Sequence, residues 1–194
     1  MNLDGIIQID QQITLWLNHF HTPETDSFWM LFSDVKVWYP AYLAVAAVLV
    51  YRLGWKKGLA VVLALALTVA LVDQSSAHIK DTLGRLRPCY TTWMLDNGLH
   101  WPMNRYNFFG FFSGHASNTF AVAVVSYLGF RTDASRTYRT YGICVFLWAA
   151  LVSLSRIMMG MHYFGDVCVG ILYGLAMGMV IGTLLRGILS KVRG

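Results

Sequence analysis

The fold is decided most clearly by residues 167–185, which read VCVGILYGLAMGMVIGTLL. These residues carry no charged side chain, and a helix of about 20 residues is long enough to cross the hydrocarbon core of a bilayer. Glycine recurs at every fourth position, at Gly170, Gly174, Gly178 and Gly182, and therefore lines one face of the helix. Small residues on one face let a neighbouring helix approach closely, so we expect this stripe to pack against another helix.

The rest of the chain repeats this apolar character. Further apolar runs lie at about 37–54, 57–79, 114–130 and 140–158, and the last run extends over 164–185 with its polar shoulder. Of the 194 residues, 56% are hydrophobic and only 13% are charged, whereas a soluble domain carries about 25% charged residues. This composition excludes soluble, disordered and collagen-like chains. We expect an all-α fold, a polytopic transmembrane helical bundle with five to six membrane helices, the sixth around 25–36.

One domain accounts for the whole length, because 194 residues leave little room for a second. We therefore expect a single integral-membrane domain over 1–194, with 1–36 as an N-terminal interfacial segment that is not removed as a signal peptide. The cysteines, Cys89, Cys144 and Cys168, show no CxxC spacing. They indicate neither a disulfide scaffold nor a cysteine-ligated metal.

The basic residues predict how the chain is oriented. The turns at 52–57 and 131–139 and the tail at 186–193 are rich in Lys and Arg and fall on one side of the expected spans. By the positive-inside rule that side is cytoplasmic, which makes 80–113 an extracytoplasmic segment. We expect a multi-pass protein of the bacterial cytoplasmic (inner) membrane with its functional end facing the periplasm or the outside.

Positive charges on the outer side go against this rule and need a local reason. Segment 80–113 carries Lys80, Arg85, Arg87 and Arg105, and Arg156 lies at the outer end of the run at 140–158. Binding of an anion at the outer membrane surface is one reason, and snorkelling toward lipid phosphates is the other.

Three short patterns carry the chemistry. In Lys80-Asp81-Thr82-Leu83-Gly84-Arg85-Leu86-Arg87-Pro88, a helix that continues to Pro88 would place Lys80 and Arg87 on one face, suited to phosphate oxygens. In Ser113-Gly114-His115, a helix N-terminus brings a hydroxyl, a glycine amide and an imidazole together, although Ser113 is also a typical N-cap.

The third pattern runs from Ser155-Arg156 to His162 and Asp166. His162 and Asp166 are four residues apart, so on a helix the carboxylate can accept the Nδ1–H and leave Nε2 free to attack. The alternative is a plain hydrogen bond at the membrane interface.

Together the patterns read K-x6-R-P, S-G-H and S-R-x5-H-x3-D, and this order resembles the phosphatidic acid phosphatase type 2 superfamily. The superfamily includes bacterial lipid phosphatases and shares its site with vanadium haloperoxidases. The resemblance covers roughly 73–170, and one departure is Phe112 where the family usually has proline.

The resemblance implies a role for each matching residue. His162 would be the nucleophile that forms a phosphohistidine, Asp166 would orient it, and His115 would be the general acid and later the base. The phosphoryl oxygens would be held by Lys80, Arg87, Ser113, Gly114 and Arg156. No metal and no cofactor is expected.

The sequence thus predicts a metal-independent lipid phosphate phosphatase. Undecaprenyl diphosphate is the leading substrate, because the chain is little more than the catalytic core and 89–112 is rich in aromatic residues. Phosphatidylglycerophosphate, phosphatidic acid and lipid A phosphates are the alternatives, and a non-catalytic anion-binding membrane protein or transporter is the alternative of another class. The expected partners are the lipid substrate and membrane lipids, with no nucleic acid and no obligate protein partner.

Overall fold

The computed structural model describes residues 3–102 and 107–191, and this part of the chain is helical. In chain order its elements are α1 (Leu3–Asn18), α2 (Pro23–Ser33), the 3₁₀ helix η1 (Val35–Trp38), α3 (Tyr39–Leu83), the 3₁₀ helix η2 (Pro88–Tyr90), α4 (Thr92–Asp96), α5 (Gly114–Phe130), α6 (Arg139–Met158) and α7 (Phe164–Leu189). The all-α class expected from the sequence is confirmed, and the predicted apolar runs correspond to α3, α5, α6 and α7.

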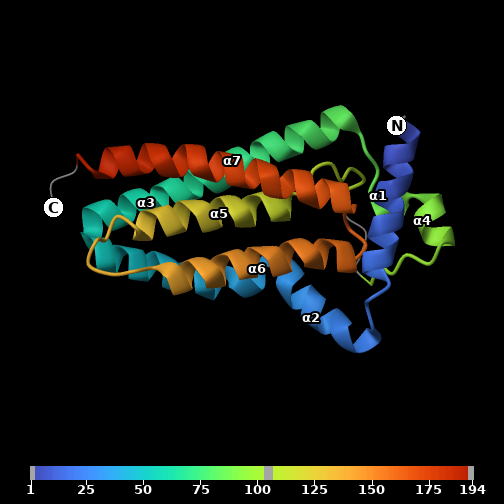
Figure 1. The fold of residues 1–194 in the computed structure, drawn as a ribbon, viewed down its shortest axis with the longest axis horizontal. Coiled ribbons are helices and arrows are strands. Elements are labelled where there is room, and N and C mark those ends of the chain that lie inside the picture. The colour runs from blue at the N-terminus through green and yellow to red at the C-terminus, as the bar shows by residue number, and fades with distance from the viewer. Residues whose placement is uncertain (1–2, 103–106, 192–194) are drawn as a thin grey trace.

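Helix α3 consists of two antiparallel arms joined at Gly54. Gly54 has φ 76° and ψ 160°, a conformation that only glycine adopts easily, and the chain reverses direction there (Figure 1). The arms pack tightly after the turn, since a Cβ built on Gly58 would lie 2.4 Å from the Cα of Val50. The two apolar runs predicted at 37–54 and 57–79 are these arms.

Helix α5 lies at the centre of the bundle and packs against α3, α6 and α7 (Figure 1). Most of its residues are buried, as expected for a helix that is apolar on all sides. The glycine stripe of α7 faces it, because Cβ atoms built on Gly170 and Gly174 would lie 2.7 Å and 2.2 Å from the carbonyl oxygens of Ser113 and Ser117. The predicted close packing of this stripe is confirmed.

Three helical segments of the described chain are long and apolar enough to cross a membrane: Val35–Leu83, Arg139–Met158 and Phe164–Leu189. Helix α2 has 11 residues, about 17 Å of helix, and is too short to span. The expected count of five to six membrane helices therefore remains a prediction, as does the assignment of 1–194 to one domain.

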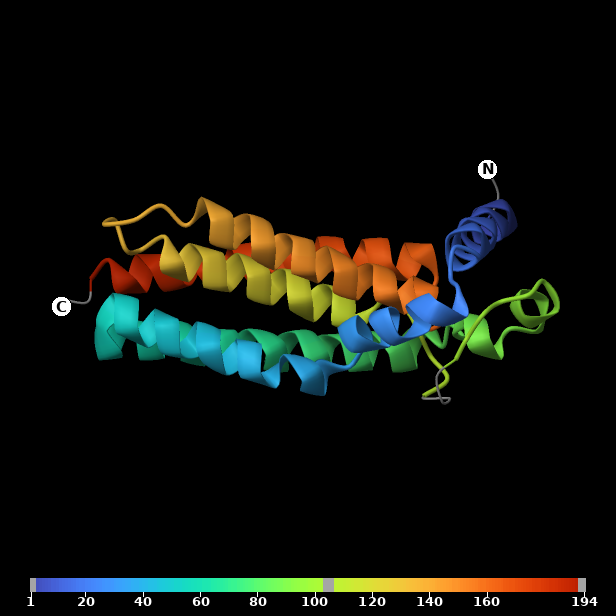
Figure 2. The same ribbon diagram turned by 90° about the horizontal axis from the view of Figure 1, so that it is seen from below.

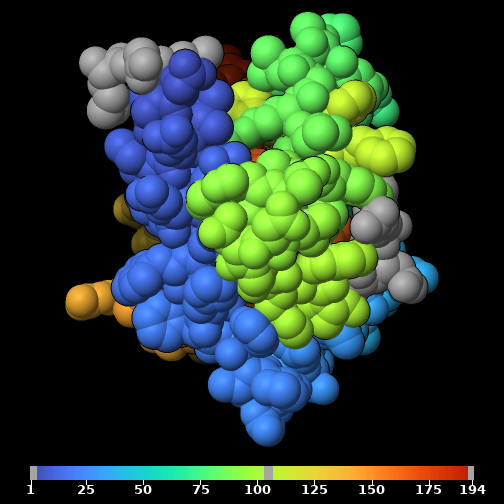
Figure 3. All heavy atoms as spheres, turned by 90° about the vertical axis from the view of Figure 1, so that its right-hand side faces the viewer, coloured from blue at the N-terminus to red at the C-terminus, as the bar shows by residue number. Residues whose placement is uncertain are grey.

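The two ends of the bundle differ in character. One end holds the turn at Gly54, the loop at 131–138 and the C-terminal end of α7, and there Arg52 pairs with Asp133 at 2.6 Å. The other end is covered by α1, α2 and α4 (Figure 2). In Figure 3 this end faces the viewer, with α1 in blue beside the segment around α4 in green. All three sequence patterns lie at this second end.

One expectation about this end was wrong. Helix α3 ends at Leu83, before Pro88, because Gly84 adopts the left-handed conformation (φ 59°) and its N–H bonds to the carbonyl of Lys80. The chain then pairs Leu86 with Phe109 as an isolated antiparallel bridge. Arg87 thus reaches the end of the bundle from an extended loop, while Lys80 stays on the helix.

Candidate active site

Three helix ends and two loops meet at one cavity of about 1730 Å³. Lys80 comes from the end of α3, Gly114 and His115 from the first turn of α5, and Arg156 from the last turn of α6. Arg87 and His162 enter from the loops before α4 and α7. Six of the eight residues predicted for the site therefore line the same space, although their sequence positions span more than 80 residues.

His162 is almost fully buried, with 2% of its surface exposed. Its Nε2 lies 2.9 Å from Nη1 of Arg87. Because a guanidinium only donates hydrogen bonds, Nε2 is the acceptor and the ring proton sits on Nδ1. Arg87 is itself held by the carbonyl of Met161 and by Asn107, which accepts through its carbonyl at 2.9 Å and its Oδ1 at 2.7 Å. This tautomer presents the lone pair of Nε2 to the cation cluster.

The carboxylate of Asp166 lies on the Nδ1 side of the same ring. The distance from Nδ1 of His162 to Oδ2 is 3.5 Å, longer than a typical hydrogen bond. Asp166 is 0% exposed, and its Oδ2 accepts the backbone N–H of Tyr163 at 3.1 Å. His162 precedes α7 and only Asp166 lies on it, so the pair expected on one helix is made by the helix N-terminus and the residues just before it.

The surroundings of His162 favour its neutral form. Burial lowers the pKa of His162 well below its usual range, and the positive charges of Arg87, Arg156 and Lys80 lower it further. A neutral imidazole keeps its lone pair and is the nucleophilic form. Geometry and electrostatics thus agree on Nε2 as the reactive atom.

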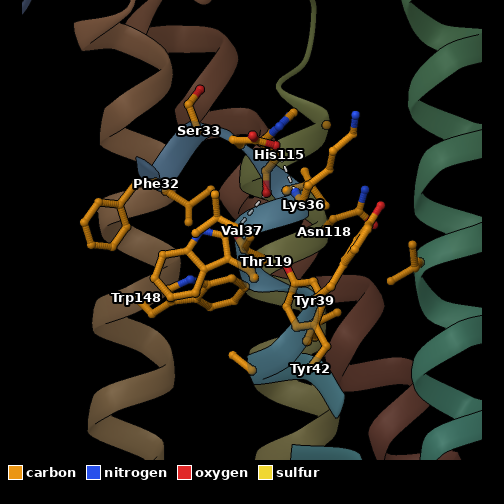
Figure 4. A pocket seen from close by; sticks show the side chains of 18 of the residues that line it. Phe32, Ser33, Lys36, Val37, Tyr39, Tyr42, His115, Asn118, Thr119 and Trp148 are labelled. Atoms are coloured by element: carbon orange, nitrogen blue, oxygen red, sulfur yellow. Dashed lines mark hydrogen bonds between the residues drawn. The ribbon is translucent and has the colours of Figure 1, made fainter. Parts of the chain in front are cut away.

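His115 faces the same cavity from α5 (Figure 4). Arg156 lies on the neighbouring helix α6 and donates through Nη1 to the hydroxyl of Ser33 at the end of α2. Helix α2 therefore closes this side of the cavity, a function of residues 1–36 that the sequence did not reveal.

Gly114 and Ser113 have different positions. Gly114 lines the cavity, and a Cβ there would lie 3.2 Å from Nζ of Lys80, so only glycine leaves the ammonium its present place. Ser113 is fully buried, caps α5 by accepting the N–H of Ala116, and does not belong to the residues that line the cavity. The N-cap alternative is what the structure supports for Ser113, and a phosphate contact from it stays a prediction.

Several site residues were missed in the sequence. Asn107 holds Arg87, and Asn118 donates to Asp73 at 2.5 Å between α5 and α3. Arg85 was noted only as a charge, yet its Nη1 donates to Oδ1 of Asp166 at 2.6 Å. The sequence pointed to Arg85 only through its positive charge on the side where the positive-inside rule disfavours such charges. Nothing in the sequence pointed to the side-chain amides of Asn107 and Asn118. Arg105, one of the positive charges noted in the sequence, lies outside the described residues.

The cavity continues from the cations into an apolar groove between α2, η1, both arms of α3 and α6. Aromatic and aliphatic side chains line it, among them Trp38, Tyr42, Leu65, Val69 and Trp148. Figure 4 shows Trp148 and Tyr42 on this side of the cavity, below His115. A charged head and an apolar tail of one molecule therefore fit one continuous space.

Among residues 3–102 and 107–191, no group of three or more His, Cys, Asp or Glu side chains lies close enough together to hold a metal ion. The expectation of a reaction without metal stays a prediction.

Comparison with known proteins agrees with this geometry. The chain is 33% identical over 175 residues to a lipid A 4′-phosphatase of Bacteroides thetaiotaomicron, a match that covers 89% of this chain and 75% of that protein. It is 30% identical over 179 residues to a lipid A 4′-phosphatase of Porphyromonas gingivalis, covering 91% of this chain and 72% of that protein.

Two solved structures share the fold. The first is a transmembrane PAP2-type phosphatidylglycerolphosphate phosphatase from Bacillus subtilis, with a TM-score of 0.71 and 19% identity, covering 99% of this chain and 90% of that one. The second is Aquifex aeolicus LpxE, with a TM-score of 0.62 and 21% identity, covering 88% of this chain and 92% of that one.

The family match covers the residues that build the site. Residues 57–187 match the PAP2 superfamily, and this range contains all three sequence patterns. The chain therefore belongs to the PAP2 superfamily and is a membrane lipid phosphatase, a hydrolase of phosphate esters.

Proposed function

We propose that the protein hydrolyses the phosphate monoester at the 4′ position of a lipid of the lipid A class, through a phosphohistidine on His162, and releases inorganic phosphate. The observation that carries the proposal is the single cavity in which Nε2 of His162 and the side chains of Arg87 and Arg156 open into an apolar groove. The lipid A 4′-phosphatases to which the chain is 33% and 30% identical support the choice of lipid.

Undecaprenyl diphosphate, the leading substrate expected from the sequence, receives less support. Its grounds are a chain that is little more than the catalytic core and the aromatic content of 89–112, and neither of these selects one lipid. The relatives favour the lipid A alternative, since both carry that activity in their names.

The first chemical step follows from the geometry. The phosphate monoester enters the cluster of Lys80, Arg87 and Arg156, which offsets its charge. Nε2 of His162 forms a bond to phosphorus while the bond from phosphorus to the sugar oxygen breaks. The ring becomes cationic, and the Asp166 carboxylate 3.5 Å from Nδ1 stabilises it. His115, which takes up a proton once the phosphate dianion offsets the surrounding cations, gives that proton to the departing oxygen.

The second step returns the enzyme to its starting state. His115, now neutral, takes a proton from water, and the water oxygen bonds to phosphorus as the bond to Nε2 breaks. Inorganic phosphate leaves, and both histidines recover their original protonation. His162 first forms and then breaks its bond to phosphorus, and His115 first gives and then takes a proton, as expected for a double displacement.

Three predictions on the setting belong to this proposal. The cavity end faces the periplasm, the basic turns at 52–57 and 131–139 lie in the cytoplasm, and the protein resides in the inner membrane as a multi-pass chain. Lipid A phosphates on the outer leaflet would then reach the groove from the bilayer.

A substrate panel tests the proposal. Purified protein in detergent is given lipid A, undecaprenyl diphosphate, phosphatidylglycerophosphate and phosphatidic acid at equal concentration, and released phosphate is measured with mass spectrometry of the lipid product. We expect lipid A to give the highest kcat/KM and to lose its 4′-phosphate. A higher value for undecaprenyl diphosphate, or loss of the other phosphate of lipid A, would reject the lipid assignment.

The mechanism has its own control. His162→Ala should release no phosphate from any of these lipids, and folded His162→Ala protein with ordinary turnover would reject the phosphohistidine. Vanadate, which adopts five-coordinate forms like the transition state, should compete with substrate in the wild-type protein.

A further inference from the structure

The N-terminal helix α1 contacts the catalytic end through a shared ion pair. Nη1 of Arg85 lies 2.6 Å from Oδ1 of Asp166, and Nη2 of the same guanidinium lies 2.6 Å from Oδ2 of Asp10 on α1. Asp10 lies outside the family match at 57–187, and it is 75 residues away from Arg85. Figure 3 shows α1 lying across this end of the molecule.

We propose that Arg85 and Asp10 are positioning residues that set the orientation and the charge of Asp166 toward His162, and so make α1 part of the catalytic machinery. The inference rests on the proposed function, because it takes His162 as the nucleophile.

The contacts around Asp166 determine which oxygen faces the ring. Arg85 occupies Oδ1, while the backbone N–H of Tyr163 holds Oδ2 at 3.1 Å. Oδ2 is therefore the oxygen that lies 3.5 Å from Nδ1 of His162. Nη1 of Arg85 holds Oδ1 of Asp166 while Nη2 is held by Asp10, so the planar guanidinium is fixed at both branches and restricts rotation of the Asp166 carboxylate. The ring of Tyr163, 4.2 Å below the guanidinium, holds Arg85 in turn.

The sharing of one guanidinium has an electrostatic consequence. With both carboxylates ionised, Asp10, Asp166 and Arg85 together carry one net negative charge. A carboxylate paired alone with an arginine would have most of its charge offset by that partner. Because Asp10 shares the guanidinium, the cluster as a whole keeps one negative charge beside His162, and this charge stabilises the imidazolium that forms on attack.

Burial makes this effect strong. Asp166 is 0% exposed, and the side chains of Arg85 and Asp10 are 27% and 12% exposed. Charges in such surroundings interact more strongly than charges in water. Neither Arg85 nor Asp10 is among the described residues that line the cavity, so the two act on the site through Asp166.

Helix α1 holds Asp10 firmly in place. Oδ1 of Asp10 accepts the N–H of Gly165 at 2.7 Å, and Thr14 accepts the N–H of Phe164 at 2.9 Å. These two N–H groups belong to the first turn of α7 and have no partner within that helix. Asn18 donates to the carbonyls of Ile157 and Met158 at the end of α6, both at 3.0 Å. The helix therefore braces the turn that carries His162 from both sides.

The test compares three variants with a matched control. Arg85→Gln removes the shared cation, Arg85→Lys keeps a charge without the fork, and Asp10→Asn removes the competing carboxylate at nearly constant shape. The control is Arg52→Gln, which breaks an ion pair of the same length, 2.6 Å to Asp133, at the opposite end of the bundle. All are measured as folded, monodisperse protein in detergent.

We expect the variants to lower kcat and leave KM unchanged. Replacing a residue that supports a functional group typically lowers activity about 10- to 100-fold. We therefore expect kcat to fall about 100-fold for Arg85→Gln and about 10-fold for Asp10→Asn, with an intermediate loss for Arg85→Lys. KM should stay within about two-fold, because the cavity contacts remain. Arg52→Gln should match the wild type in both constants.

A second readout separates positioning from general damage. With p-nitrophenyl phosphate the leaving group needs no proton, so His115→Ala should lose far less activity than it does with lipid. Arg85→Gln acts on the nucleophile and should lose the same factor with both substrates. The rate of phosphohistidine formation in a single turnover should fall by that factor as well.

The outcomes are distinguishable. The inference is overturned if His162→Ala is inactive while Arg85→Gln and Asp10→Asn keep wild-type kcat, or if their losses appear in KM alone. The proposed function, and not the inference alone, fails if His162→Ala keeps ordinary turnover. If Arg85→Gln does not fold, Asp10→Asn and Arg85→Lys decide by the same criteria.

Discussion

Replacing Gly174 by Ala tests the tight contact between α7 and α5. A Cβ at this position would lie 2.2 Å from the carbonyl oxygen of Ser117 and 2.9 Å from its Cα. Carbon and oxygen normally approach to about 3.3 Å, so α5 and α7 must separate by about 1 Å there. The atoms in the way are backbone atoms, which cannot rotate aside as a side chain does.

The size of the effect follows from two opposing contributions. Overpacking typically costs about 1–3 kcal/mol, and contact with backbone places this site near the upper value. Alanine is the better helix former by about 1 kcal/mol, which offsets part of the loss. The net loss is about 2 kcal/mol in the free energy of unfolding, which corresponds to a Tm lower by roughly 4–8 °C for a chain of this size.

The assay is thermal unfolding in one detergent, followed by tryptophan fluorescence and by the monodisperse fraction after heating. Gly187→Ala is the matched control, since it lies on the same helix and a Cβ there meets no atom within 4 Å. The control should melt at or slightly above the wild-type temperature. Equal melting temperatures for Gly174→Ala and Gly187→Ala would refute the close packing of α5 and α7.

Three further predictions concern the site and its setting. Gly110→Ala should lower kcat about ten-fold with little loss of Tm, because its Cβ would lie 3.2 Å from Oδ2 of Asp166 and 3.6 Å from Nδ1 of His162, and small misplacements at reacting groups are costly; wild-type kcat would contradict it. Because the pKa of His162 is lowered in the fold, this residue should cost the wild type up to about 1.4 kcal/mol per pH unit as pH falls below about 6.5, and folded His162→Gln should lose less stability than the wild type between pH 7 and pH 5, as denaturation at both pH values would reveal. In a background without native cysteines, Asp96→Cys should react with an impermeant thiol reagent in intact spheroplasts and Ala134→Cys only after lysis, and the reverse pattern would overturn the predicted orientation.

The apolar runs and the patterns that carry the chemistry were predictable because their rules are local. A bilayer sets the length of a span, and glycine at every fourth position sets which face of α7 is small. The same runs predict that Lys80, His115 and His162 lie at one end of the bundle. Successive spans alternate in direction, and each of these residues lies where a span ends or begins at that end. The order of these residues also identifies the family.

Other features depended on backbone details that the sequence signals only in part. Gly84 ends α3 four residues before Pro88, so Arg87 approaches from a loop paired through Leu86 and Phe109. The sequence offered both glycine and proline as helix stops, and local rules do not rank them here. Likewise Ser113 fitted two roles, and its burial at the start of α5 decides for the N-cap.

The sequence by itself determined the class of fold and the end of the bundle that holds the three patterns, because both follow from periodicity and spacing within short segments. The catalytic roles of the residues in these patterns are what the family resemblance implies, and they stay a prediction. Only the tertiary structure decided that Asp10 on α1 shares Arg85 with Asp166, and that Nε2 of His162 faces Arg87. These contacts join residues about 75 positions apart, and for such pairs the spacing along the chain carries no information about distance in space. They depend on how α1 and the loops that carry Arg87 and His162 pack at the helix ends, which only the folded chain fixes.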